Sequence, residues 1–128
     1  MTKTQRIQMT AAAITLLLAT LLGAFGTHGL RGNLSPGAWE TFNTAVEYQF
    51  YHGLGLLGTA IVTLRFPDSG LIRAAGWLLL AGILLFCGSL YLLAFGAPSQ
   101  LGAIAPIGGT AFMLGWLAFA VGVFRERA

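Results

Sequence analysis

Four apolar stretches, each about as long as a membrane-spanning helix, constrain this chain more than any other feature. A helix needs about 20 predominantly apolar residues to cross the hydrocarbon core of a bilayer. Four stretches meet this requirement: residues 7–30, 45–64, 71–95 and 101–124. Only 9% of the residues are charged, whereas about a quarter are charged in a soluble domain. The sequence therefore predicts an all-α integral membrane protein and excludes an ordinary soluble globule.

Short polar links predict how these helices are connected. Pro67 and Pro98 each lie in a short polar link that separates two apolar stretches. Such short links make consecutive helices antiparallel neighbours. Ser35 and Pro36 suit an N-cap and a first helical position, so an interfacial part is expected to precede the second span, with or without a bend. We expect one domain, residues 1–128, forming a four-helix antiparallel bundle with helices at 7–30, 36–64, 71–95 and 101–124.

The basic residues predict the orientation. Lys3 and Arg6 before an apolar run resemble the start of a signal peptide, but the run is too long for that, so we expect a retained helix. Under the predicted topology Arg31 lies on one side of the membrane, and the other side carries Lys3, Arg6, Arg65, Arg73, Arg125 and Arg127. The positive-inside rule then places both termini in the cytoplasm, and we expect a multi-pass protein of the bacterial inner membrane. The basic residues form no patch for nucleic acid.

Small residues recur at heptad spacing and predict the packing faces. This spacing favours a left-handed bundle, and small residues let helix backbones approach each other in lipid. We interpret the following as packing positions: Gly26 in the first helix, Gly82 and Ser89 in the third, and Gly108, Gly115 and Gly122 in the fourth.

Polar residues inside a membrane are costly and are candidates for a functional site. Under the predicted topology they gather in the outward half, while the cytoplasmic half is expected to be almost purely apolar. Besides Gln49 and Thr110, which we do not select, this half supplies the candidate ligand-binding residues His28, Glu47, Tyr48, Tyr51, His52, Ser89, Tyr91 and Pro106. Pro106 is expected to remove a hydrogen bond to the Gly102 carbonyl, which makes either a packing kink or part of a ligand pocket.

The two histidines are expected to have different partners. Glu47 and His52 point about 140° apart on a helix with 3.6 residues per turn, so they do not form one site. His28 and Glu47 both lie within a few residues of the outer boundary of the membrane. We therefore expect a hydrogen bond or ion pair between them, which is either a structural clasp or a proton-responsive site. The difference in depth between His28 and His52 argues against a haem held by both. The spacing offers no zinc motif, so no cofactor or metal is expected.

Several motifs together resemble a known family. They are Gly23-Ala24-Phe25-Gly26-Thr27-His28-Gly29-Leu30, Glu47-Tyr48-Gln49 with His52, Gly88-Ser89-Leu90-Tyr91-Leu92, and Pro106-Ile107-Gly108-Gly109 with Phe112 and Gly115-Trp116. This combination is similar to the YgdD/YwdK-type family of small bacterial membrane proteins, a domain of unknown function with eukaryotic transmembrane relatives. The family commonly has alanine where Thr27 stands. The resemblance implies a four-helix inner-membrane protein and supplies no catalytic residues.

The expected function is binding rather than catalysis, because the sequence contains no activated nucleophile and no paired carboxylates. Cys87, the only cysteine, is expected to be a small buried side chain. We expect the outward polar cluster to bind a lipid, a quinone-like molecule or a partner helix, with a homo-oligomer left open. Two alternatives remain: an accessory or assembly subunit of a larger membrane complex, and a proton or small-solute conductor, which the apolar cytoplasmic half disfavours.

Overall fold

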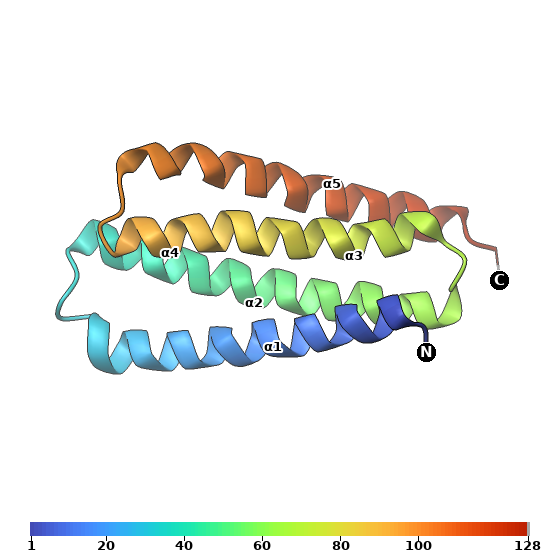
Figure 1. The fold of residues 1–128 in the computed structure, drawn as a ribbon, viewed down its shortest axis with the longest axis horizontal. Coiled ribbons are helices and arrows are strands. Elements are labelled where there is room, and N and C mark those ends of the chain that lie inside the picture. Colours follow the sequence, from blue (N-terminus) through green and yellow to red (C-terminus); the bar gives the residue numbers. More distant parts are fainter. Residues whose placement is uncertain (128) are drawn as a thin grey trace.

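The computed structural model describes residues 1–127, which are helical apart from short links. Its elements are α1 (Lys3–Phe25), the π-helix η1 (Gly26–Leu30), α2 (Pro36–Arg65), α3 (Gly70–Gly82), the π-helix η2 (Ile83–Cys87), α4 (Gly88–Ala94), the 3-10 helix η3 (Ser99–Ala103) and α5 (Ile104–Arg125). Because α1 continues into η1, and α3 through η2 into α4, these elements make four long helical rods (Figure 1). The predicted helix boundaries agree with these rods to within four residues.

Local capping explains where the rods begin. The Thr2 hydroxyl accepts a hydrogen bond from the Gln5 amide at 3.1 Å, and the Gln5 side chain accepts one from the Thr2 amide at 2.7 Å. This capping box adds a turn that apolar length alone does not reveal, so the first helix begins at Lys3 rather than residue 7. At α2 the Ser35 hydroxyl accepts from the Ala38 amide, and Pro36 follows the cap as expected. α2 then runs as a single helix to Arg65.

The rods lie side by side in chain order (Figure 1). α1 packs along α2, α2 packs against the rod formed by α3, η2 and α4, and that rod packs along α5. α1 meets α3 close to the N-terminus, where the Gln8 amide donates to the Arg73 carbonyl at 3.0 Å. Farther along, α1 has little direct contact with α4. α1 and α4 therefore pack only weakly against each other.

The glycines expected at packing positions are buried where two rods cross. A Cβ added to any of them would collide with a neighbouring side chain or backbone. The pairs are Gly26 with Phe42, Gly82 with Phe112, Gly108 with Phe86, Gly115 with Leu79, and Gly122 with Ile72. Ser89 is also buried, and its hydroxyl donates to the Phe86 carbonyl at 2.9 Å.

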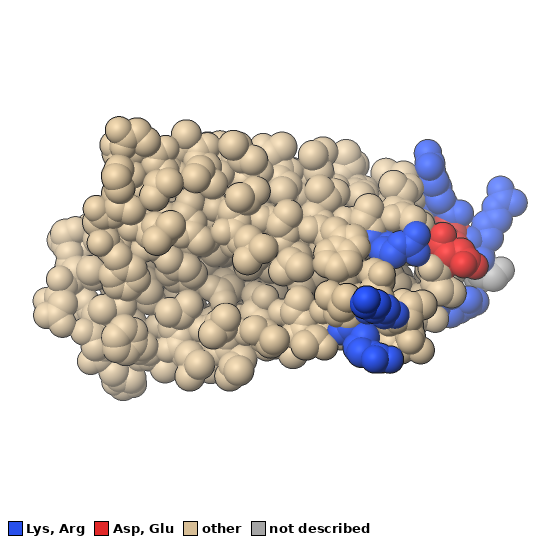
Figure 2. All heavy atoms as spheres, viewed as in Figure 1, with Lys and Arg blue, Asp and Glu red and all other residues tan. Residues whose placement is uncertain are grey.

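Hydropathy distinguishes α2 from the other three rods, and charge distinguishes one end of the molecule from the other. Three rods are long and apolar enough to cross a membrane: Lys3–Leu30, Gly70–Ala94 and Ser99–Arg125. α2 is not among them, and it is the rod that carries Glu47, Gln49 and His52. Charged side chains gather at one end of the molecule (Figure 2), where both termini and the link between α2 and α3 lie. This basic end holds Lys3, Arg6, Arg65, Arg73, Arg125 and Arg127 together with Asp68 and Glu126.

Candidate functional site

A groove along the side of the molecule is the first candidate site. It lies between α1 and the η2–α4 part of the third rod, with α2 as its floor, and has a volume of about 350 Å³. This volume falls at the lower end of the range of about 300–1,000 Å³ for small-molecule sites. Most of its lining is apolar, and the residues are Thr15, Leu18, Leu21, Leu22, Gln49, Ile83, Leu84, Cys87, Gly88 and Tyr91.

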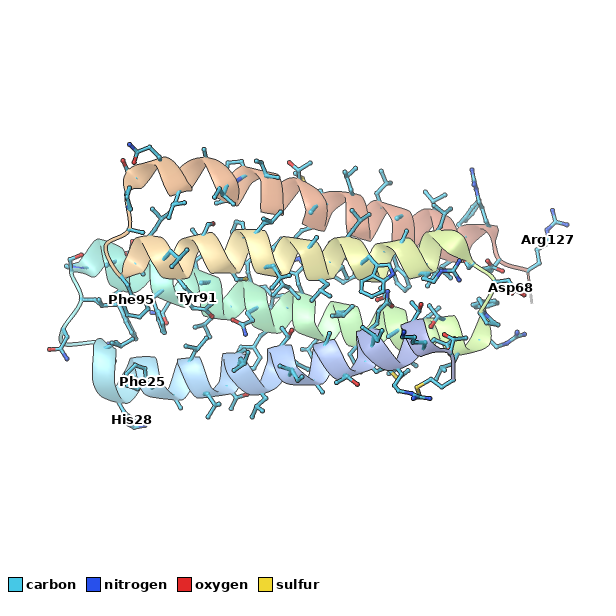
Figure 3. The ribbon with its side chains drawn as sticks, viewed as in Figure 1. Phe25, His28, Asp68, Tyr91, Phe95 and Arg127 are labelled. Carbon is cyan, nitrogen blue, oxygen red and sulfur yellow. The ribbon has the colours of Figure 1, made fainter. Side chains whose placement is uncertain are left out.

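The floor of the groove carries a polar pair. The side chain of Gln49 is 5% exposed, and its Nε2 donates to the Thr15 carbonyl at 2.9 Å. The Tyr91 hydroxyl donates to Gln49 Oε1 at 2.6 Å, and Figure 3 shows Tyr91 projecting from α4 toward α2. A primary amide has a second N–H, and both oxygens keep a lone pair. The pair can therefore still donate to, or accept from, a bound molecule.

Small residues and aromatic contacts position this pair. Gly53 lies one turn after Gln49, and a Cβ there would come within 2.9 Å of Leu16 Cδ2 and 3.0 Å of Thr15 Cγ2. The absent side chain lets α1 approach α2 closely enough for Gln49 to reach the Thr15 carbonyl. Tyr91 is held by an edge contact with Phe42, whose ring centroid is 5.5 Å away. η2 forms part of the wall, and π-helical turns occur frequently at functional sites.

The predicted site residues do not form one cluster. Tyr91 lies in the groove, whereas Tyr48 and His52 line a second pocket, shared with α5, and Ser89 is bonded to its own helix. Glu47, Tyr51 and Pro106 are exposed. Among residues 1–127 no three His, Cys, Asp or Glu side chains gather as a metal site.

The predicted contact between His28 and Glu47 does not form. Both side chains are exposed, and no hydrogen bond or ion pair joins them within the described part of the chain. His28 lies in η1 and points away from the other rods (Figure 3). At 100° per residue His28 lies about 200° around the helix from Gly26, which packs against Phe42 of α2, so His28 faces away from α2 even in a regular helix.

The loss of a helical hydrogen bond expected at Pro106, as a kink or as part of a pocket, does not occur within α5. Pro106 is the third residue of α5, and Gly102 belongs to the preceding 3-10 turn. The first four N–H groups of an α-helix have no partner within it, so a proline in this turn costs no α-helical hydrogen bond.

Three buried glutamines were not selected from the sequence. Gln5 Nε2 donates to the Thr63 carbonyl at 2.9 Å, and Gln8 and Gln49 likewise donate to carbonyls of neighbouring helices. Gln5 and Gln8 are buried near the basic end, so the expectation that this half is almost purely apolar is wrong. Gln5 and Gln8 are three residues apart and therefore lie on one face of α1, and this spacing could have identified them from the sequence.

The fold and the hydropathy of the rods define a small helical membrane protein, and comparisons with known proteins identify its family. Residues 22–109 match the family described as "Protein of unknown function (DUF423)". The chain is 44% identical to the UPF0382 membrane protein YwdK of Bacillus subtilis, over 88% of this chain and 92% of that protein. It is 39% identical to a UPF0382 membrane protein of Haemophilus influenzae, over 94% and 95% of the two chains. The chain therefore belongs to this uncharacterised family of membrane proteins. No solved structure matches it significantly.

Proposed function

We propose that this protein is a non-enzymatic binder of a quinone-like, membrane-soluble molecule, which enters the groove between α1 and α4 from the lipid. The observation that carries the proposal is the Gln49–Tyr91 pair, because it presents unused hydrogen-bonding capacity to an otherwise apolar groove. A ring carbonyl of the ligand accepts the second N–H of Gln49, and its apolar tail lies along Leu18, Leu21 and Leu22.

The proposal includes four membrane-spanning rods. α2 has 30 residues and is therefore about 45 Å long at 1.5 Å per residue, which exceeds the hydrocarbon core of about 30 Å. Neighbouring rods cover Gln49 and His52, which are 5% and 7% exposed, whereas Glu47 of the same rod is exposed. The basic end faces the cytoplasm of a bacterial inner membrane under the positive-inside rule. Reporter fusions after Arg127 and within residues 31–35 test this orientation, and a periplasmic carboxyl terminus refutes it.

Depth favours a quinone-like ligand over a phospholipid headgroup. Gln49 lies 13 positions after Pro36, or about 20 Å along α2. With α2 centred in the bilayer, this places Gln49 about 12 Å below the outer hydrocarbon boundary. A charged headgroup stays at the interface, since its burial is costly. A neutral carbonyl-bearing ring reaches this depth at much lower cost.

Filling the groove provides the test. Gly88 lines the groove, and a Cβ there meets nothing within 4 Å, so Gly88→Leu places its side chain in the groove. Gly58→Leu is the matched control, because Gly58 also has open space and lies outside the groove. Each protein is purified with its native lipid in polymer-bounded discs, and the extracted small molecules are measured by mass spectrometry.

We expect a quinone to accompany the wild type and Gly58→Leu at near-stoichiometric amounts, and to fall at least tenfold in Gly88→Leu. Equal amounts in all three samples, or none in the wild type, overturn the proposal. Stoichiometric larger subunits without a quinone also overturn it and favour an accessory role in a membrane complex.

A further inference from the structure

A second pocket lies on the side of α2 that faces α5. It has a volume of about 320 Å³ and is lined by Tyr48, His52, Phe86, Gly109, Phe112, Met113 and Trp116. It shares no lining residue with the groove. Four aromatic side chains surround His52, the one imidazole in the lining. The chemistry of this imidazole determines what the pocket can bind.

The orientation of the His52 ring is fixed on two sides. The side chain is 7% exposed, and Phe112 stacks on it with ring centroids 3.5 Å apart and an interplanar angle of 10°. Tyr48 is also nearly parallel to it, at 5.7 Å and 20°. His52 Nδ1 lies 2.9 Å from the Tyr48 carbonyl oxygen. Because a carbonyl only accepts, Nδ1 must carry the hydrogen.

This tautomer leaves Nε2 as the chemically distinctive atom of the pocket. In a neutral imidazole with Nδ1 protonated, Nε2 is a hydrogen-bond acceptor. Among residues 1–127 no donor is bonded to it. Nε2 is not fully buried, since Gln8 Oε1 is the one fully buried side-chain N or O atom without a partner in the described residues, so Nε2 is open to the pocket. In surroundings as apolar as lipid, an acceptor without a partner costs free energy. A ligand that donates a hydrogen bond to this nitrogen removes that cost.

We infer that this pocket binds a flat aromatic ring bearing a hydroxyl group, a phenol or hydroquinone, whose O–H donates to His52 Nε2. The aromatic walls favour a flat ring, which stacks offset or edge-on against Phe86, Phe112 and Trp116. The lone pair of Nε2 requires a donor, so a quinone with only carbonyl oxygens fits less well. No carboxylate lines the pocket, which disfavours a cation. The groove at Gln49 offers a free N–H as well as acceptor lone pairs, so it accommodates a ring carbonyl and does not require a donor.

The experiment uses two probes with the same ring. 1-Naphthol has a hydroxyl donor, and 1-methoxynaphthalene does not. The full chain is labelled with ¹⁵N at its two histidines, and a His28→Asn variant identifies the signals of His52. The imidazole nitrogens are recorded by NMR in lipid discs, and the binding of both probes is titrated.

We expect the free protein to show Nδ1 protonated, and 1-naphthol to shift Nε2 toward the protonated type while Nδ1 changes little. 1-Methoxynaphthalene should bind about tenfold more weakly, as expected for one lost hydrogen bond, and should leave Nε2 unshifted. Equal affinities, equal shifts, or a protonated Nε2 in the free protein overturn the inference.

Blocking variants locate the binding. A Cβ at Gly109 has its nearest neighbour, Phe86 Cδ2, at 3.9 Å, so Gly109→Leu extends into this pocket and should abolish the Nε2 shift. Gly88→Leu fills the other groove and should leave the shift unchanged. If Gly88→Leu removes the shift and Gly109→Leu does not, the ligand occupies the groove and the inference is wrong. The inference stands or falls separately from the proposed function, since each site has its own blocking variant.

Discussion

Replacing Gly108 by alanine tests whether close backbone contact holds α5 to the third rod. A Cβ at this position would fall on the backbone nitrogen of Phe86 and lie 2.8 Å from its Cα. Backbone atoms cannot rotate aside as a flexible side chain does. The two rods must therefore separate by at least 0.6 Å for this second distance to reach the 3.4 Å of ordinary contact. Gly82 crosses at the same place, since a Cβ there would meet the Gly108 carbonyl oxygen at 3.0 Å.

Two opposing contributions set the change in the free energy of unfolding caused by Gly108→Ala. Alanine in place of glycine favours a helix by about 1 kcal/mol, and overpacking a tight contact costs about 1–3 kcal/mol. A gap of about 0.5–1 Å also removes a quarter to a half of the dispersion attraction between facing atoms. Because the whole α3–α5 contact widens, we expect Gly108→Ala to be destabilised by about 2 kcal/mol.

Gly109→Ala is the matched control, since it changes the neighbouring residue of the same helix without a close contact. We expect its free energy of unfolding to equal that of the wild type or to exceed it by up to about 1 kcal/mol, because alanine has the higher helix propensity. Unfolding by sodium dodecyl sulfate, followed by circular dichroism in mixed micelles, measures both free energies. Equal stability of the two variants would refute the reasoning, because helix propensity would then outweigh backbone contact.

Three further predictions concern polar contacts. Gln49→Leu leaves the Tyr91 hydroxyl without its acceptor and should cost about 1–2 kcal/mol in the same unfolding assay; no loss would show that the pair contributes nothing to stability. Gln8→Leu should cost less than half as much, because Gln8 Oε1 is buried without a partner and its removal offsets the lost bond to Arg73; a larger cost than Gln49→Leu contradicts this. Thr2→Ala removes one half of the capping box and should cost about 1 kcal/mol, with faster amide hydrogen exchange confined to the first turn of α1; exchange that stays unchanged there argues against the cap.

Much of the fold was predictable because its signals are local. The length of an apolar run, the N-cap at Ser35 and the prolines near the links depend on neighbouring residues alone. They located all four rods, and the motif combination identified the family. The start of α1 was missed because a capping box of Thr2 and Gln5 extends the helix beyond its apolar part.

The candidate sites were less predictable because they depend on how separate helices face one another. Projection at a constant angle per residue correctly separated Glu47 from His52, but it could not show that Gln49 meets Tyr91, 42 positions away. His28 points outward rather than toward Glu47, because it lies about 200° around its helix from the packing residue Gly26.

The sequence by itself therefore determined that this chain forms long apolar helices, where they begin and end, and which polar residues they carry. Only the tertiary structure decided which of those residues meet, because rotation and spacing of the helices depend on non-local contacts. Gly53 brings Thr15 of α1 within reach of Gln49, and Phe112 of α5 fixes the ring of His52, although Gln49 and His52 lie only about 60° apart around α2. One expected polar cluster thus became two candidate sites, since Gln49 is hydrogen-bonded to α1 and α4 whereas His52 stacks on a ring of α5.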